Sequence, residues 1–150
     1  MDSPDSLDVV LDFAIDKEIE ANQFYVGLAK KMKNPAMRQV FTAFANEELG
    51  HKAKLEAIKR GQKIQPAAEV ADLRIADYLV DVEPGPDMSY QDALVLAMKN
   101  EKAAFRLYVD LADEVQDKDL KAIFLALAQE EAKHKLRVEI EYDEAVLTEN

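Results

Sequence analysis

The two histidines of the chain each follow a glutamate at a distance of three residues. The two motifs are Glu48-x-x-His51 and Glu131-x-x-His134. On a helix this spacing places a carboxylate and an imidazole on one face, where both can bind the same metal ion. Apolar residues lie one turn from each motif, so we expect both motifs to face the protein core. The pattern therefore predicts metal binding by buried side chains.

Glu18 and Glu101 are the other two candidate ligands, because each is flanked at helical spacing by apolar residues. Four ionised glutamates close together in a core would repel one another, and protonation or a cation relieves that repulsion. One glutamate from each of two helices, with Glu-x-x-His from two others, is the ligand pattern of di-iron and di-manganese carboxylate bundles. The predicted ligands are Glu18, Glu48, His51, Glu101, Glu131 and His134.

An internal repeat relates these residues in pairs. An offset of 83 residues aligns 14–55 with 97–138 without a gap, and 14 of the 42 positions are identical. The ligand candidates coincide under this offset, and Tyr25 coincides with Tyr108. These tyrosines could be core fillers or could donate hydrogen bonds that orient a ligand carboxylate. The repeat indicates two duplicated halves.

Apolar residues recur at helical intervals over four long segments, and no segment is typical of a strand. We expect helices at about 7–32, 35–60, 89–115 and 118–147, with a crossover at about 62–88 that has room for one short helix. Short links between the first two and the last two helices predict two antiparallel hairpins, joined by the long crossover. The fold class is therefore an all-α four-helix bundle, in a single domain spanning 1–150.

The helix ends and faces can also be predicted. Asn34, Ser89 and Asp117 suit helix starts, and Gly61 suits a left-handed C-terminal cap. The apolar residues of the last helix predict its inner face, with Ile123, Phe124, Leu127, Ala128, Leu136 and Ile140. An apolar shell around the ligands is expected from Ile15, Phe24, Phe105, Phe124 and Leu127.

Composition excludes several classes of function. The chain has 30 acidic and 19 basic residues and a formal charge of -11, which argues against binding to nucleic acid or to an anionic membrane surface. It has no cysteine, so thiolate metal sites and disulfides are excluded. The start lacks the features of a secretory signal, and no apolar run is long enough to span a membrane. We therefore expect a soluble cytoplasmic protein.

The sequence resembles the rubrerythrin family of ferritin-like proteins over residues from about 7 to 145. Four segments carry the likeness: Glu18-Ile-Glu-Ala-Asn-Gln-Phe-Tyr25, Glu47-Glu48-Leu-Gly-His51, Asn100-Glu101-Lys-Ala-Ala-Phe105 and Leu127-Ala-Gln-Glu-Glu131-Ala-Lys-His134-Lys-Leu. The resemblance implies a ferritin-like bundle, usually a dimer, with a non-haem di-iron centre that reduces hydrogen peroxide while oxidising ferrous iron. It also implies that Glu48 and Glu131 bridge two iron ions, while Glu18 and Glu101 cap the ends.

The chain departs from the family pattern in two ways. Typical members carry a cysteine-ligated rubredoxin domain, whereas this sequence ends at Asn150 without a cysteine, so we expect a separate electron-donor protein. Typical members also have a further carboxylate where this chain has Ala104, mirrored by Ala21. The resulting six-ligand set is closer to a bacterioferritin-like ferroxidase site.

Several alternatives therefore stay open. The protein could be a ferroxidase that uses dioxygen and serves iron storage, a non-catalytic iron carrier or redox sensor, or a bundle without metal. Carboxylate and imidazole ligands suit manganese as well as iron, so a manganese or mixed-metal centre is an alternative to two iron ions. The resemblance implies a homodimer, and the long crossover would also permit hairpins to be exchanged between chains.

Overall fold

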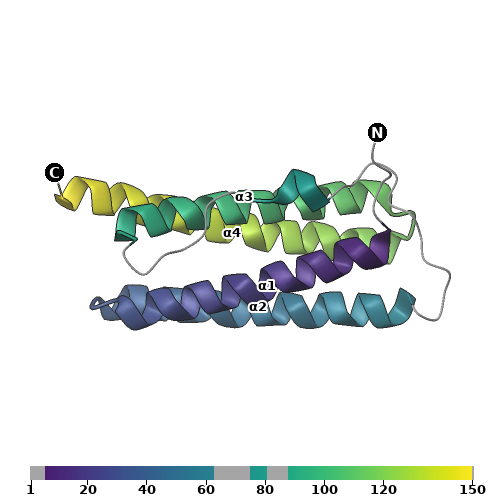
Figure 1. The fold of residues 1–150 in the computed structure, drawn as a ribbon, viewed down its shortest axis with the longest axis horizontal. Helices are drawn as coiled ribbons and strands as arrows, with labels where there is room; N and C mark the ends of the chain where they lie inside the picture. Colours follow the sequence, from purple (N-terminus) through teal and green to yellow (C-terminus); the bar gives the residue numbers. More distant parts are fainter. Residues whose placement is uncertain (1–5, 63–74, 81–87, 150) are drawn as a thin grey trace. The chain divides into compact units, whose positions relative to one another are not determined.

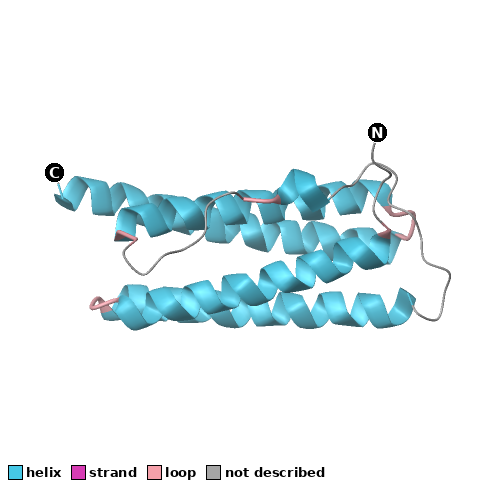
Figure 2. Cartoon of the chain, in the orientation of Figure 1, coloured by secondary structure: helices cyan, strands magenta, loops and turns pink. Residues whose placement is uncertain are grey.

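The computed structural model describes residues 6–62, 75–80 and 88–149. Within these ranges the regular elements are all helical (Figures 1 and 2). They are α1 (Leu7–Lys31), α2 (Pro35–Gln62), the short 3-10 helix η1 (Ile75–Tyr78), α3 (Tyr90–Glu114) and α4 (Lys118–Glu149). None of the described helices has an apolar stretch that could cross a bilayer.

The chain divides into two compact units, an N-terminal unit of residues 1–75 and a C-terminal unit of residues 76–150. The N-terminal unit contains α1 and α2, which pack against each other as an antiparallel hairpin because only three residues link them. Leu11, Phe41 and Leu55 are fully buried in this unit. These residues recur at helical spacing with the buried glutamates, so the same face of each helix carries both the core and the candidate ligands.

The C-terminal unit repeats the hairpin with α3 and α4, again with a three-residue link. Leu94, Leu111 and Phe124 are fully buried there. The short helix η1 is attached to α3, because the buried Tyr78 donates a hydrogen bond of 2.6 Å from its hydroxyl to Asp110. A second tyrosine links α3 to α4 in the same way: the Tyr90 hydroxyl lies 2.9 Å from Oε1 of Glu141. The first bond holds η1 on α3, and the second holds α3 against α4 at the start of α3.

Each long helix begins at a side chain that accepts hydrogen bonds from the first-turn amides. Ser6 and Ser89 cap α1 and α3, with Oγ accepting from the amides of Val9 at 3.3 Å and Asp92 at 3.1 Å. Asn34 and Asp117 cap α2 and α4 at distances from 2.9 Å. The predicted caps at 34, 89 and 117 are confirmed. All four caps obey the same offset of 83 residues, so the repeat includes the helix starts.

The observed helices begin and end within two residues of the predicted ranges, but the prediction for Gly61 is wrong. α2 continues through Gly61 to Gln62, and none of the described glycines has a positive φ. Glycine permits a left-handed cap without requiring it. Most of the predicted crossover lies outside the described residues. The part of it that the structure describes is η1 with the residues that follow it, 75–80. The prediction of a single domain stays a prediction.

The predicted inner face of α4 is partly wrong. Phe124, Leu127 and Ala128 are buried as predicted. Ile123, Leu136 and Ile140 are exposed instead, by 37%, 59% and 44%. The apolar residues of α4 lie on more than one stripe, so hydrophobicity alone does not identify the stripe that faces the core. The buried stripe is the one that carries Glu131, His134 and Val138.

Candidate metal centre

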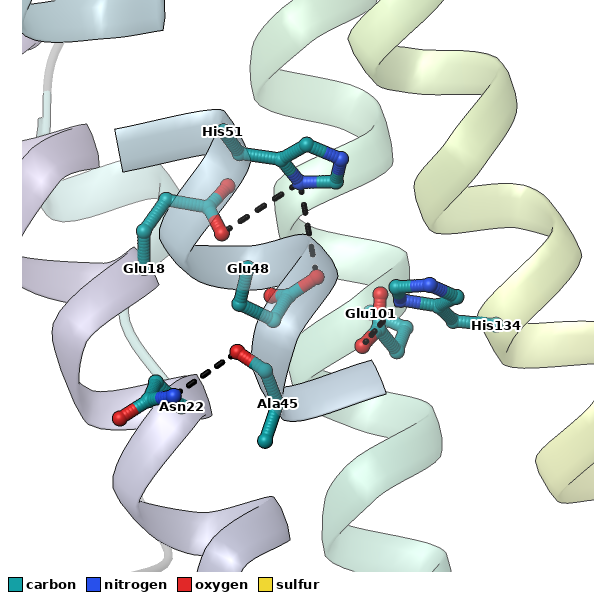
Figure 3. Close-up of polar contacts among 7 residues, drawn as sticks. All are labelled: Glu18, Asn22, Ala45, Glu48, His51, Glu101 and His134. Atoms are coloured by element: carbon teal, nitrogen blue, oxygen red, sulfur yellow. Dashed lines mark hydrogen bonds and ion pairs between the residues drawn. The ribbon is translucent and has the colours of Figure 1, made fainter. Parts of the chain in front are cut away.

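The N-terminal unit brings together Glu18 from α1 with Glu48 and His51 from α2, a set we call the N-terminal triad (Figure 3). All three residues are at most 2% exposed. The Nδ1 atom of His51 lies 3.5 Å from Oε2 of Glu18 and 3.5 Å from Oε1 of Glu48. The Glu-x-x-His spacing on α2 thus places both side chains on the face that meets α1, as predicted from the sequence.

The C-terminal unit contains the equivalent set, Glu101 from α3 with Glu131 and His134 from α4, which we call the C-terminal triad. Its members are also at most 2% exposed. The Nδ1 atom of His134 lies 3.6 Å from Oε1 of Glu101 (Figure 3). Each unit therefore assembles three of the six predicted ligands from two adjacent helices.

The geometry within each triad fits a divalent cation. In each triad, one ligand atom from each of the three residues lies within 4.8 Å of the others. Oxygen and nitrogen ligands bind such ions at about 2.0–2.2 Å. Two ligands of one ion are therefore separated by roughly 3–4 Å, as the histidine nitrogens and carboxylate oxygens are here. Two buried carboxylates also require a compensating positive charge, which an ion would provide.

The type of ligand narrows the choice of metal. Carboxylate oxygens and imidazole nitrogens suit iron and manganese, and the chain has no thiolate that would select a softer ion. The buried Glu/His clusters are thus consistent with a di-iron site. The exposed Glu20 and Glu47, which neighbour the ligands in sequence, are solvated and take no part in the triads.

Asn22 is a site residue that the sequence analysis missed. Its side-chain amide donates a hydrogen bond of 2.8 Å to the carbonyl oxygen of Ala45, which links α1 to α2 close to the N-terminal triad (Figure 3). Asn22 follows Glu18 by four residues and so lies one turn along the same side of α1. That spacing was a usable signal, but its backbone partner on α2 could not be inferred from residue types.

Tyr25 and Tyr108, the two tyrosines singled out from the sequence, are each only 1% exposed. Tyr25 is part of an aromatic cluster, formed with Phe24, Phe41 and Phe44. Its ring stacks on Phe41 at 6.0 Å and meets Phe44 edge-on at 5.4 Å. Packing in the core therefore accounts for the burial of Tyr25, and hydrogen bonding of either tyrosine to a ligand carboxylate stays a prediction.

The predicted apolar shell is only partly formed. Phe124 and Leu127 are fully buried, while Ile15 and Phe24 are half-buried. Phe105 is 37% exposed, so its assignment to the shell is wrong. Phe105 lies four residues after Glu101, at the edge of the buried face of α3 rather than at its centre.

Comparison with known proteins supports the same family and fold. A sequence model of the Rubrerythrin family matches residues 10–139. A solved structure of a protein of unassigned function from Pyrococcus furiosus is 29% identical, with a TM-score of 0.69, and the match covers 92% of this chain and 89% of that one. No curated protein sequence shows significant similarity to the chain.

A second solved structure establishes the fold class. It is a protein from Thermotoga maritima with a provisional assignment as a ferritin-like diiron-carboxylate protein. It is 20% identical to this chain, has a TM-score of 0.77, and matches over 97% of this chain and 99% of its own length. The match confirms the predicted class, an all-α, ferritin-like four-helix bundle of two hairpins.

Proposed function

Since the chain belongs to the rubrerythrin family, we propose that it is a non-haem di-iron oxidoreductase that reduces hydrogen peroxide while oxidising ferrous iron. The observation that carries this proposal is the presence of two buried Glu/Glu/His triads, one in each unit, related by the repeat of 83 residues. A structural bundle has no need of four buried glutamates, whereas a pair of divalent ions does.

In the proposed centre, the histidine and the two glutamates of each triad would hold iron. By the family resemblance, Glu48 and Glu131 would be the bridging ligands, and Glu18 and Glu101 would be the terminal ligands. When bound, the ions supply Lewis acidity and one electron each, and two electrons with two protons convert one hydrogen peroxide into two waters. A manganese or mixed-metal centre is the variant to be distinguished by metal analysis.

The chain's own side chains would position the ligands and exclude bulk water. The ligand helices carry buried apolar side chains one turn from the ligands, such as Phe44 before Glu48 and Leu127 before Glu131. Rigid helices place ligands more accurately than loops do. Burial of the carboxylates also limits the access of water, which would otherwise compete with them as a ligand of the ions.

The proposal includes two partners. Electrons would come from a separate donor protein, and the charge of -11 suits a donor that docks through a basic surface. The chain would act as a homodimer, in which hairpin exchange is an open alternative. Size-exclusion chromatography with light scattering checks this part, because a monomer would contradict it.

The decisive experiment is to load the protein with ferrous iron without oxygen, count the bound ions, and compare oxidation by peroxide and by dioxygen. We expect two ions per chain and a much faster reaction with peroxide. Replacing Glu131 or His134 with Ala should abolish peroxide-driven oxidation. Glu48→Ala should have the same effect. Its matched control is Glu47→Ala, because the exposed Glu47 neighbours the ligand in sequence and its loss should leave turnover unchanged.

A second candidate is a ferroxidase that uses dioxygen and serves iron storage or detoxification. The observation that favours it is the pair Ala21 and Ala104, which leaves the ligand set with six members and nearly symmetric. A faster reaction of the iron-loaded protein with dioxygen than with peroxide would select this candidate. Stoichiometric iron binding without turnover by either oxidant would instead indicate a non-catalytic iron carrier or sensor.

A further inference from the structure

We propose that Asn22 is a positioning residue that fixes Glu18 against Glu48 and His51. As a result, the N-terminal triad binds its ion more tightly than the C-terminal triad. This inference rests on the proposed function, because it takes metal binding at both triads as its premise. It adds a difference in metal affinity between two triads that are identical in residue type.

The hydrogen bond of Asn22 lies within one helical turn of both carboxylates. Its Nδ2 atom donates to the carbonyl oxygen of Ala45 at 2.8 Å, in a partly buried environment (Figure 3). Asn22 is four residues beyond Glu18 on α1, and Ala45 is three residues before Glu48 on α2. A helix carbonyl has a second lone pair, so it can accept this bond while it remains in the helix ladder. The bond therefore sets the register of α1 on α2 at the triad.

Register matters here because the triad combines ligands from two helices. Glu18 and Glu48 are both 2% exposed, and without an ion their charges repel each other. That repulsion favours separation or sliding of the two helices. A direct bond from the side chain of one helix to the backbone of the other opposes both movements. A ligand set that is already in place loses less conformational freedom when an ion binds, and its affinity is correspondingly higher.

At the equivalent position of α3, the C-terminal unit has a side chain that cannot form this bond. The repeat places Phe105 at the position of Asn22 and Ala128 at the position of Ala45. A phenyl ring has no polar hydrogen to donate, and this one is 37% exposed. The ligands are thus repeated in both units, but the side chain that fixes the helix register is present in only one.

The test measures Co²⁺ binding by calorimetry in two backgrounds of the full-length chain. His134→Ala leaves the N-terminal triad intact, and His51→Ala leaves the C-terminal triad intact. Adding Asn22→Leu, which keeps the approximate size but removes the donor, should weaken Co²⁺ binding about tenfold in the first background, the lower end of the range for residues behind metal ligands. It should weaken binding by a clearly smaller factor in the second background, because there only Glu48, proposed as a bridging ligand, depends on Asn22. Phe105→Leu, the matched control at the equivalent position, should change neither by more than twofold.

Asn22→Ala separates the hydrogen bond from packing. Leu has a higher helix propensity than Asn, so circular dichroism of the metal-free Leu variant should show full helicity. If the bond is responsible, Ala and Leu should weaken binding to a similar extent. Loss of affinity with Ala alone, equal losses in both backgrounds, or no loss in the His134→Ala background would each overturn the role of Asn22. Failure of the unmodified chain to bind Co²⁺ would instead remove the proposed metal function itself.

Discussion

The two units of the chain carry the same ligands in different surroundings. In the N-terminal unit, Phe44 precedes Glu48 by about one helical turn and belongs to the aromatic cluster, in which Tyr25 contacts three phenylalanines. Under the repeat, the positions of Phe24 and Phe44 are occupied by Leu107 and Leu127. The six candidate ligands keep their residue types under the repeat, as the proposed metal centre requires, whereas a core position accepts any apolar side chain of suitable volume.

At one pair of positions the C-terminal unit has a polar link where the N-terminal unit has apolar residues. Its bond between Tyr90 and Glu141 occupies the positions that are Leu7 and Ile58 in the other half. A buried hydrogen bond and an apolar contact can stabilise a hairpin by similar amounts. The comparison teaches that the repeat preserves the chemistry of the site while the means of holding the helices together has changed.

Truncation of a core phenylalanine should give the largest difference in stability between equivalent positions of the two units. Phe41 and Phe124 are equivalent under the repeat, and both are completely buried. Replacement with Ala should cost about 3–5 kcal/mol at either position. Phe41→Ala should cost about 1 kcal/mol more, because it also removes the stacking on Tyr25 and the edge contact with Phe44.

Urea unfolding of the metal-free protein checks this difference in the free energy of unfolding. Phe41→Leu and Phe124→Leu are the controls, since they keep most of the buried volume and remove only the ring. The difference between the two Leu variants should approach the aromatic contribution alone. Equal losses for Phe41 and Phe124 in both series would show that the aromatic cluster adds nothing beyond apolar burial.

Metal removal should lower the stability of the loaded chain. With free metal at a thousandfold above its Kd, removing it should lower the free energy of unfolding by about 4 kcal/mol. Glu18→Gln or Glu101→Gln should change the free energy of unfolding in opposite directions in the two states. Each should stabilise the metal-free protein by relieving repulsion between carboxylates, and each should destabilise the loaded protein by removing a ligand. Thermal unfolding with and without a chelator measures both effects. A Gln variant that destabilises the metal-free chain would show that the glutamate has a favourable partner other than metal.

Local patterns predicted most of this structure. The Glu-x-x-His spacing and the cap residue Asn34 act over one helical turn, and both were placed correctly from the sequence. The partner of Asn22 is 23 residues away, on another helix, so residue types could not reveal it. The exposure of Leu136 also depends on contacts between helices. Several apolar stripes on α4 are compatible with a helix, and tertiary packing selects the one that is buried.

The tyrosine bonds predict that the two units differ in alkaline stability. Burial, and then the hydrogen bond to Asp110, raise the pKa of Tyr78 above its usual range. Burial and the bond to Glu141 raise the pKa of Tyr90 in the same direction. A raised pKa in the folded state gives stability that is complete below the unfolded value of about 10 and is lost as the pH increases further. Above pH 10 the free energy of unfolding should fall by at most about 1.4 kcal/mol per pH unit for each tyrosine.

Urea unfolding at pH 8 and at pH 11 measures this loss. Tyr78→Phe and Tyr90→Phe should each reduce the difference between the two pH values, because Phe does not ionise. At pH 8 each variant should cost about 1 kcal/mol, the value of one hydrogen bond. Tyr142→Phe, which removes a tyrosine from the same unit with no comparable bond to a carboxylate among the described contacts, is the control. A slope that is unchanged in both Tyr78 and Tyr90 variants would assign the alkaline loss to other groups.

The smallest expected difference concerns the caps of the second helix in each unit. Asn34 and Asp117 are equivalent under the repeat, and each accepts hydrogen bonds from two first-turn amides. Replacement with Ala should cost about 1 kcal/mol at either position. Asp117→Ala should cost a further 0.3–1 kcal/mol or so at low ionic strength, because the aspartate charge also interacts favourably with the helix dipole, and salt screens that part. Unfolding in low salt and in about 1 M salt separates the two contributions, since the shared cap bond should persist while the excess disappears. An excess that survives high salt would mean that Asp117 stabilises α4 through its hydrogen-bond geometry rather than through its charge.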